Sequence, residues 1–522
     1  SEGIFVFAPA SAPVAVGDLV EVTGTAKEFF GQTEIGDVTD NTVNSSANPL
    51  PTPASPVVPT SVGDTPVPWE SIEGLSVVFG QPLFVSDLFP LGRYGEIGLS
   101  AIGPNDHPNQ VADVGSTEAV DVRQLNIDSR VVLDDGEDEN ESFPSGISSW
   151  NPTPTPYLDG PEGTVRAGDR IDQLSGVVHY SFGEYEVQPV NPADATDPDG
   201  GVDIVRTPRP TSVPDVGGDL TVASFNVLNY FVTIDSGGAT CGPPSNPQGC
   251  RGADSQEEFD LQSAKITDAI ADLDADIVGL IELENSANDE AIADLVAKVN
   301  ARSSRTYTYV PTGYIGADAI VVGIMYDSAT VAPDGAIGIL DSTVSPAFID
   351  DKNRPALAQT FVDLGSGENM TVVVNHLKSK GSACDDVDNP GDPAFGVEPY
   401  ALGADADVGP LGDPLFTGNC NLTRTAAAKV LGQWVAEDPT GTPSDNLLIL
   451  GDLNAYANED PITELEGQGY TNLKSAFTAS NSWADGGHSY VFDGEFGTLD
   501  YAMANSALTA QVTGAEAWHI NA

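Results

Sequence analysis

The sequence of 522 residues predicts an α+β protein in which an all-β first part precedes a larger part of mixed helices and strands. Up to residue 212, short β-rich runs alternate with clusters of proline and glycine, and no amphipathic helix is evident. From residue 216 onward, apolar strands alternate with segments whose apolar residues recur at helical spacing. The second pattern predicts two packed sheets with helices on their outer faces.

The all-β part is predicted to contain two units, residues 1–50 and residues 51–212. Its strands are expected near residues 18–23, 75–78, 131–133 and 174–178. Two segments rich in proline are expected to be linkers, residues 48–59 and residues 190–215. The acidic run at residues 133–141 has two interpretations, a solvated loop or a calcium site with oxygen ligands.

Three helices are predicted in the second part because apolar residues recur on one helical face of each. Such a face buries its helix against a sheet. The faces comprise Phe259, Ile266, Ile270 and Leu273, then Ile292, Leu295, Val296 and Val299, and finally Ala427, Val430, Leu431 and Trp434.

Residues 447–454 carry the strongest functional signal. Four aliphatic residues predict a buried strand, which ends in a glycine followed by Asp452 and Asn454. In an extended chain these two side chains point the same way, so they emerge together from a sheet edge. The carboxylate can accept a proton or bind a metal, and the amide can bind an oxyanion. The alternative is an ordinary turn, where Asp and Asn are common.

Four further strands end in polar residues of catalytic type. Residues 221–229 deliver Asn226, residues 276–285 deliver Glu282, and residues 371–380 deliver His376 with two lysines behind it. Residues 497–501 place Asp500 beside an apolar run. Each has an ordinary explanation alone, but together they predict one pocket at a sheet edge, suited to phosphoester chemistry.

The order of these strands resembles the endonuclease/exonuclease/phosphatase superfamily, and five segments resemble secreted bacterial nucleases of the ExeM/NucH type. These segments are ASFNVLNYF (223–231), NHLKSKG (375–381), NCNLTRT (419–425), GDLNAY (451–456) and WHINA (518–522). The likeness runs over nearly all of residues 213–522. It continues more weakly upstream, where GIFVF (3–7) and VGDLVEVTG (16–24) resemble the family's oligonucleotide/oligosaccharide-binding (OB) barrel.

The resemblance implies a four-layer DNase I-like sandwich over residues 213–522, preceded by OB-like β domains. It implies Mg²⁺ or Mn²⁺ as cofactor, with Ca²⁺ as a further candidate. Glu282 matches the family's metal-binding glutamate, and Asn226 lies at the matching position on the first strand. Glu284 faces the same way by strand parity but matches less well.

The remaining roles follow from the same resemblance. Asp452 would orient or deprotonate the attacking water or share the metal, and Asn454 would hold a phosphoryl oxygen. His376 would donate a hydrogen bond or a proton, and Arg354 would orient His376 or bind phosphate. In the family, the aspartate that Asp500 matches orients a second histidine in a Ser-Asp-His segment, which is absent here, and His519 is not its equivalent. Both ends of the chain are therefore expected to be trimmed relative to family members.

The net charge of −58 opposes nucleic-acid binding, because 20 Lys and Arg face 78 Asp and Glu. Salt screens such repulsion beyond about 10 Å, and an acidic surface suits a saline habitat. Residues 213–522 hold twelve basic residues, and six of them fall in the motif segments: Arg251, Arg354, Lys378, Lys380, Arg424 and Lys429. They predict a local phosphate-binding patch that includes Arg354, Lys378 and Arg424; the alternative is chance surface positions.

Cys241, Cys250, Cys384 and Cys420 allow three disulfide pairings, and reduced thiols or a metal site are alternatives. No CxxC pair or nearby histidine supports zinc. The resemblance implies the pairs Cys241–Cys250 and Cys384–Cys420. Disulfides are typical of an oxidising, extracellular location.

The leading hypothesis is therefore an extracellular, metal-dependent nuclease that cleaves DNA, with RNA as a further substrate. A second is a phosphodiesterase or phosphatase of the same fold that acts on lipids or nucleotides. A third is a non-enzymatic, acidic matrix or surface protein. The sequence has no run of 18 apolar residues that would span a membrane, and it identifies no protein partner.

Overall fold

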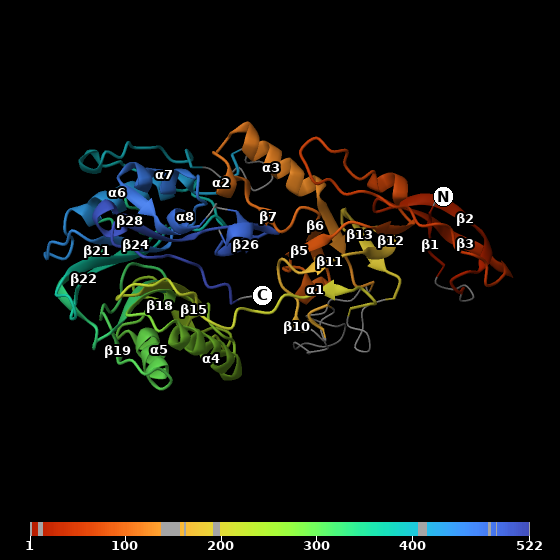
Figure 1. The fold of residues 1–522 in the computed structure, drawn as a ribbon. Coiled ribbons are helices and arrows are strands. Elements are labelled where there is room, and N and C mark those ends of the chain that lie inside the picture. The colour runs from red at the N-terminus through yellow and green to blue at the C-terminus, as the bar shows by residue number, and fades with distance from the viewer. Residues whose placement is uncertain are drawn as a thin grey trace.

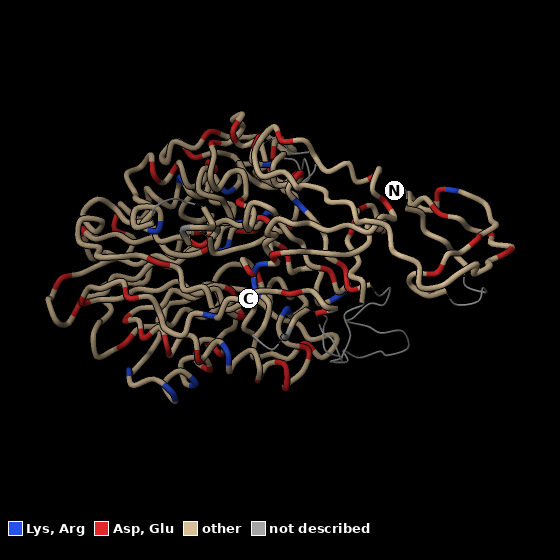
Figure 2. Tube along the Cα trace, turned by 45° about the vertical axis from the view of Figure 1, so that its right-hand side comes forward, with Lys and Arg blue, Asp and Glu red and all other residues tan. Residues whose placement is uncertain are grey.

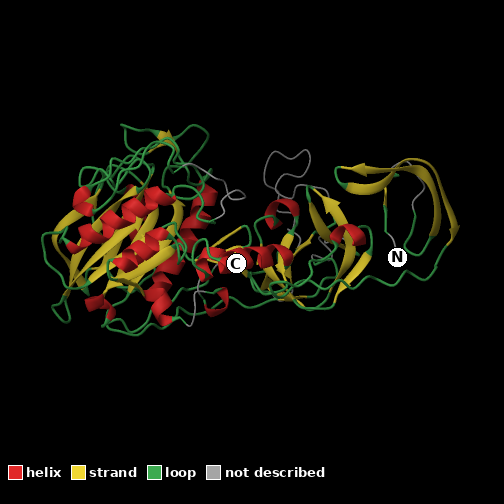
Figure 3. Ribbon diagram, turned by 90° about the horizontal axis from the view of Figure 1, so that it is seen from above, coloured by secondary structure: helices red, strands yellow, loops and turns green. Residues whose placement is uncertain are grey.

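The computed structural model describes residues 3–8, 14–136, 157–160, 163–191, 199–405, 415–478, 482–486 and 488–520. Three parts follow one another in space: a small N-terminal sheet, a middle part and a larger C-terminal domain (Figures 1 and 3). Within these described ranges, no helix combines the length and the apolar character needed to cross a bilayer.

The N-terminal part is a three-stranded sheet in the order β1-β3-β2. Strands β2 (Leu19–Phe29) and β3 (Gln32–Ser45) form a long antiparallel hairpin, and β1 (Phe5–Val6) runs parallel to β3. Many of its apolar side chains are exposed, and Phe30 at the hairpin turn is 89% exposed.

The middle part is built on an eight-stranded sheet in the order β14-β11-β5-β6-β8-β13-β12-β4. Its core includes Val85, Leu99, Val131, Leu133 and Val187. The described strands form an open order rather than a closed barrel, so the OB-like barrel stays a prediction. The strands are β4 (Ser76–Phe79), β5 (Leu83–Asp87), β6 (Ile97–Ser100), β8 (Arg130–Leu133), β11 (Arg170–Ile171), β12 (Leu174–Ser181), β13 (Glu184–Pro189) and β14 (Ile204–Val205).

The prediction that residues 51–212 are all β is wrong in one respect, because helix α3 (Thr117–Asp128) spans 12 residues there. Ser116 caps it by accepting a hydrogen bond from the backbone N–H of Ala119. Its buried residues are only Ala119 and Asn126, so the sequence shows no apolar stripe. Shorter helical turns are η1 (Trp69–Ile72), α1 (Leu91–Tyr94) and α2 (Pro108–Val111).

The C-terminal domain contains two facing sheets, with orders β15-β18-β20-β19 and β21-β22-β23-β24-β28-β25. Alternation along β23 explains its continuous apolar run: Val372 and Val374 pack in the core shared by both sheets, whereas Val373 packs with helix α6. At Gly279 the sheets come so close that a β-carbon would lie 2.8 Å from Val374 Cγ2. The strands are β15 (Val222–Tyr230), β18 (Ile277–Glu284), β19 (Tyr307–Tyr309), β20 (Ile320–Asp327), β21 (Val331–Leu340), β22 (Arg354–Asp363), β23 (Asn369–His376), β24 (Leu447–Asp452), β25 (Tyr470–Asn472) and β28 (Asp500–Asn505).

Helices cover the outer face of each sheet (Figure 1), as the helical spacing predicts. Helices α4 (Gln256–Leu273) and α5 (Glu290–Asn300) lie on the first sheet, and α6 (Asn421–Ala436) and α7 (Asp460–Gly467) lie on the second. The domain is therefore a four-layer, DNase I-like sandwich. Its remaining helical turns are η2 (Pro393–Phe395), α8 (Leu473–Phe477), η3 (Trp483–Asp485) and α9 (Ser506–Thr509).

A small third sheet joins the middle part to the C-terminal domain. Strand β7 (Asn105–Asp106) pairs in parallel with β27 (Glu495–Gly497), which also pairs with β26 (Tyr490–Phe492). The buried Glu495 accepts hydrogen bonds from Arg123 at 2.8 Å and from Asn126 at 2.7 Å. Nearby, the rings of His107 and Tyr456 stack with centroids 3.7 Å apart. The middle part is thus docked against residues 451–456 of the C-terminal domain.

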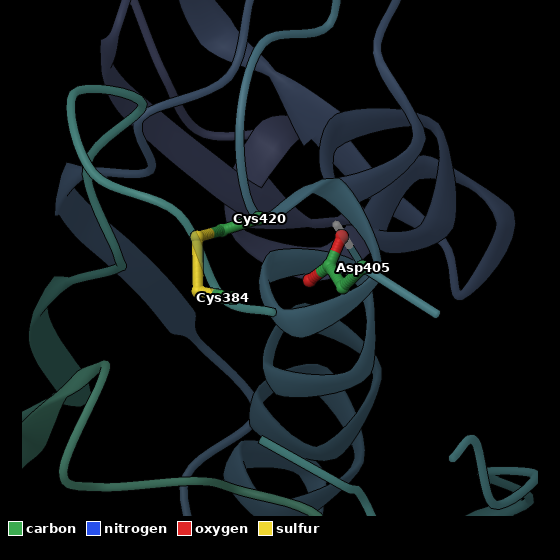
Figure 4. Close-up of side chains that lie close together, drawn as sticks. All are labelled: Cys384, Asp405 and Cys420. Atoms are coloured by element: carbon green, nitrogen blue, oxygen red, sulfur yellow. A yellow bond between two sulfur atoms is a disulfide. The ribbon is translucent and has the colours of Figure 1, made fainter. Parts of the chain in front are cut away.

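Two disulfides close loops of the C-terminal domain, in the pairing that the family resemblance implies. Cys241 bonds to Cys250 in the hairpin of β16 (Thr240–Cys241) and β17 (Gln248–Gly249), and Cys384 bonds to Cys420 at the start of α6. Beside the second disulfide, Asp405 accepts hydrogen bonds from the backbone N–H groups of Leu422 and Thr423 (Figure 4). Because both sulfurs are bonded to each other, this group is a helix cap rather than a metal site.

Three carboxylates of the middle part lie close together. Ligand atoms of Glu96, Asp134 and Glu186 are all within 4.8 Å of one another. Burial, followed by the charge of Glu186, raises the pKa of Asp134 from its ordinary 3.8 to about 8. Residues 137–141 of the acidic run lie outside the described residues, so the calcium interpretation stays a prediction.

This pKa predicts a stability effect. Between pH 4 and 8 the folded protein keeps a proton that unfolded Asp134 has released, so the free energy of unfolding falls as pH rises. Asp134→Asn cannot ionise and removes this loss. We expect its melting midpoint, measured by calorimetry with chelator present, to exceed that of the wild type by at least about 2 °C at pH 8 and to match it near pH 4. The exposed Asp203→Asn is the control. An equal shift at both pH values would show that Asp134 ionises normally.

Candidate active site

Four predicted residues form a row across neighbouring strands of the second sheet. Arg354 on β22 is the cross-strand partner of His376 on β23, His376 is the partner of Asp452 on β24, and Asp452 is the partner of Asp500 on β28. Strand pairing therefore brings four side chains, separated by up to 146 positions, to one edge of the sheet.

The first sheet delivers Asn226 and Glu282 at irregularities in its strands. The pairing shifts register between Asn226 and Tyr230 on β15, and between Leu280 and Leu283 on β18. Glu282 lies in that interruption with φ of 69°, an unfavourable conformation for a residue with a side chain. Its carboxylate accepts hydrogen bonds from Asn226 Nδ2 at 3.2 Å and from the Asn229 backbone N–H at 3.1 Å. Bulges of this kind redirect side chains and are common beside active sites.

The two sheets present their carboxylates to a common space. Burial, followed by the neighbouring charge of Asp500 and that of Glu282, raises the pKa of Asp452 well above its usual value. Burial, with a contribution from Glu282, also raises the pKa of Asp500. The charges of Asp500 and Glu282 thus oppose ionisation of Asp452, and a bound cation would relieve this repulsion.

His376 is buried between a cation and a carboxylate. Its Nε2 lies 3.3 Å from an Arg354 guanidinium nitrogen and 3.7 Å from Asp452 Oδ2. Burial, followed by the charges of Arg354 and of further basic residues nearby, lowers its pKa well below the usual 6.5, so the ring is neutral at neutral pH. Because a guanidinium only donates, this contact assigns the acceptor role to Nε2 and the ring proton to Nδ1.

Asp318 is a site residue that the sequence prediction missed. Its Oδ2 accepts from Arg354 Nε at 2.8 Å, and its Oδ1 accepts from Arg251 at 2.6 Å. It therefore holds two guanidinium groups beside His376. Arg251 directly follows Cys250, so the first disulfide anchors the loop that supplies this cation.

Asn454 and Asp500 each have local partners. The backbone N–H of Asn454 donates to Asp452 Oδ1 at 2.8 Å, and its side-chain amide donates to the Leu377 carbonyl at 3.0 Å. Asp500 accepts a hydrogen bond from Ser489 Oγ at 2.9 Å. Among the residues that the structure describes, no histidine bonds to Asp500.

Three further residues border Asp500 and were not predicted: Ser489, Tyr490 and Lys474. Burial, followed by the charges of Asp452 and Glu282, raises the pKa of the Tyr490 phenol, which places this ring beside the catalytic carboxylates. Burial lowers the pKa of Lys474 to about 8, and the charge of Asp500 opposes this change. These residues lie in short, irregular segments that have no apolar periodicity.

Arg424 corrects the phosphate-binding prediction. The side chain is fully buried, and its guanidinium donates to the carbonyls of Lys378 at 3.1 Å, Asn419 at 2.6 Å and Thr417 at 3.1 Å. It therefore joins the loop after β23 to the start of α6, and its guanidinium is not exposed to bind phosphate.

Lys378 is also buried, at 8% exposure, and its ammonium donates to Ser379 and Ser382. Burial, followed by the charges of Arg354 and Arg424, lowers its pKa to about 8.

The Glu284 carboxylate accepts hydrogen bonds from the backbone N–H groups of Val232 and Thr233, so Glu284 has a structural role.

The donor set at this edge suits a hard cation. Carboxylate and amide oxygens from Glu282, Asn226 and Asp452 are the ligands that Mg²⁺ and Mn²⁺ prefer. In the described part of the chain, these residues are not among the groups whose ligand atoms gather within 4.8 Å.

The two facing sheets and the carboxylates at their shared edge define a protein of the DNase I-like class. A model described as the Endonuclease/Exonuclease/phosphatase family matches residues 223–519, which is more than half of the chain. The chain belongs to this family, whose members hydrolyse phosphate esters.

Solved structures similar to this chain include a mannosyl-6-phosphatase from Bacteroides thetaiotaomicron, which is 13% identical, with a TM-score of 0.32, over 55% of this chain and 86% of that one. The human Nocturnin catalytic domain with bound sulfate is 17% identical, with a TM-score of 0.29, over 47% and 75%. D. rerio TDP2 complexed with single strand DNA product is 14% identical, with a TM-score of 0.29, over 47% and 76%. No match was found among curated proteins.

The position of Arg424 predicts a loss of stability in Arg424→Met. The variant leaves three buried carbonyls without their donor, and hydrogen bonds to charged groups contribute roughly 1.5–3 kcal/mol each. We expect a melting midpoint several degrees lower. Lys429→Met, on the same helix but half-buried, is the control and should melt near the wild type. If Arg424→Met instead melted normally, bound DNA more weakly and showed a flatter salt dependence of DNA binding, Arg424 would have to be assigned a phosphate contact after all.

Proposed function

We propose that this protein is a metal-dependent nuclease that hydrolyses phosphodiester bonds of DNA, with RNA as a further substrate. The proposal rests chiefly on the row of Arg354, His376, Asp452 and Asp500, which faces Glu282 across the edge of the two sheets. A row that runs from a guanidinium to carboxylates can hold an anionic phosphate at one end and activate water at the other.

The metal would be held by Glu282, with Asn226 or Asp452 as further oxygen ligands. When bound, such an ion neutralises phosphoryl oxygens and stabilises the leaving oxyanion. The Asn226 side chain and the Asn229 backbone N–H each donate to one oxygen of the Glu282 carboxylate, so its position beside the shared space is fixed.

The surrounding residues would complete the reaction. Asp452 would accept a proton from the attacking water, because a raised pKa makes its carboxylate a stronger base. Arg354 and Arg251, held by Asp318, would bind the phosphoryl oxygens. His376 would hydrogen-bond the reacting phosphate, and Asn454 would hold a phosphoryl oxygen.

We also propose an extracellular location and the ExeM/NucH type for this nuclease. Two disulfides support the location, because such bonds persist in oxidising compartments. Acidic residues are distributed over all three parts of the chain, whereas basic residues are few (Figure 2). Such a surface suits a protein that works in salt, where repulsion from DNA is screened.

This proposal predicts metal-dependent cleavage that requires Glu282 and Asp452. Purified protein should nick plasmid DNA with Mg²⁺ or Mn²⁺ and not with EDTA. Asp452→Asn should lower kcat about 10²- to 10⁴-fold because it removes the base. Glu282→Gln should raise the metal concentration that gives half-maximal activity, because an amide is a weaker ligand than a carboxylate.

The matched control is Glu257→Gln, which removes an exposed carboxylate in the first turn of α4. Its activity and metal dependence should equal those of the wild type. Metal-dependent hydrolysis of p-nitrophenyl phosphate without cleavage of DNA would instead identify a phosphatase. No hydrolysis of either substrate with either metal would favour the non-enzymatic hypothesis.

A further inference from the structure

A cleft of about 2360 Å³ extends from the catalytic edge to the middle part of the protein. Asn226, Asp500 and Lys474 line it at the catalytic end, and residues of β5, α1 and the β12–β13 turn line it at the other end. A polymer bound in this cleft would therefore lie against Asn226 and Asp500 at one end and against the middle part at the other.

Exposed aromatic rings lie along this cleft. Phe89 is 92% exposed, Phe492 is 59% exposed and Phe182 is fully exposed, although most phenylalanine side chains are buried in folded proteins. Tyr490 and Tyr94 are also exposed there. An aromatic ring in water loses the stabilisation of burial, so several such rings along one cleft indicate a binding surface.

Hydrogen bonds and chain connectivity link these rings to the catalytic edge in order. Ser489 bonds to Asp500, and Tyr490 and Phe492 follow on β26, where alternate residues share one face. At the end of this hairpin, the Gly494 carbonyl accepts a hydrogen bond from Ser86 Oγ at 2.7 Å. Ser86 lies three positions before Phe89, so the aromatic path passes from the C-terminal domain to the middle part.

The charges along this path favour contacts to bases over contacts to phosphates. Arg93 is exposed, lies 5.0 Å from the ring centroid of Tyr94 and makes no ion pair with any described residue. Arg130 is already paired with Glu184, and Asp493 at the hairpin turn is acidic. Of the described lysines and arginines that line the cleft, Arg93 and Lys265 are the two without an ion pair or hydrogen bond, so flat ring faces are the main attractive feature. Only unpaired bases expose their faces for stacking.

We infer that Phe492 and Phe89, with Arg93 beside them, bind an unpaired stretch of nucleic acid whose scissile bond lies at the catalytic edge. This inference rests on the proposed nuclease function and adds a preference for single-stranded substrate. Stacking is less weakened by salt than phosphate contacts are, which suits a chain with a net charge of −58.

The test measures binding of a fluorescent single-stranded 12-mer to the full-length protein by anisotropy, with EDTA present to prevent cleavage. Phe492→Ala and Phe89→Ala should each raise Kd roughly 5- to 150-fold, as expected for the loss of one stacked base. Phe492→Trp should keep the affinity, and the matching blunt duplex should bind more weakly than the single strand. Arg93→Ala should reduce the slope of log K against log salt concentration by about 0.7.

The control is Phe30→Ala, which removes an equally exposed ring from the N-terminal sheet, outside the cleft, and should leave Kd unchanged. Wild-type Kd values in both cleft variants would overturn the inference. So would variants whose sedimentation changes while Kd does not, because that result would identify a second copy of the chain as the occupant of the cleft. Hydrolysis of bis(4-nitrophenyl) phosphate, which has no base to stack, tests catalysis separately. If the wild type binds single strands through Phe492 but hydrolyses no diester, the nuclease function is refuted. The binding surface would still stand.

Discussion

The parallel pairing of β23 with β24 is the constraint on which the site depends. It places His376 opposite Asp452, and the next pairings add Arg354 on one side and Asp500 on the other. A shift of one residue in any of these strands would turn its polar side chain to the opposite face. Gly451 makes this pairing possible immediately before Asp452, because its φ is 118° and a β-carbon there would lie 2.1 Å from the Asn375 carbonyl oxygen.

The local balance of charge at the site differs from that of the whole chain. Three carboxylates face one space from two sheets, and the charges of Asp500 and Glu282 raise the cost of ionising Asp452. On the other side of His376, Asp318 orients two guanidinium groups. A strongly acidic protein can therefore present a cation-binding pole next to an anion-binding pole over a short distance, where salt screens little. Overall net charge is a poor guide to what such a site binds.

Asp500 begins β28 instead of closing a strand, and Asn226 and Glu282 lie at irregularities within β15 and β18. The sequence does predict the strand-end positions of His376 and Asp452, because a strand has a period of two and its C-terminal end is marked by a change from apolar to polar residues. It could not reveal Asp318, which lies in a loop and meets Arg354 only through the tertiary fold. The burial of Arg424 had a detectable signal, since position 424 shares the helical face of Ala427, Leu431 and Trp434. The NCNLTRT motif, by contrast, favours a phosphate-binding role for the Arg424 charge. Helix α3 had no such signal, because capping and contacts with the other domain stabilise it rather than an apolar stripe.

The docking of the middle part gives the catalytic edge a second wall. The β7–β27 pairing, the buried Glu495 and the His107–Tyr456 stack fix this wall against the segment that carries Asp452 and Asn454. A parallel strand pair with buried, fully bonded polar groups does not slide freely, because each displaced group would lose its partner away from water. These contacts therefore hold the middle part in place beside the second sheet. Its residues line the same cleft as Asn226 and Asp500, although none of them belongs to the row of Arg354, His376, Asp452 and Asp500.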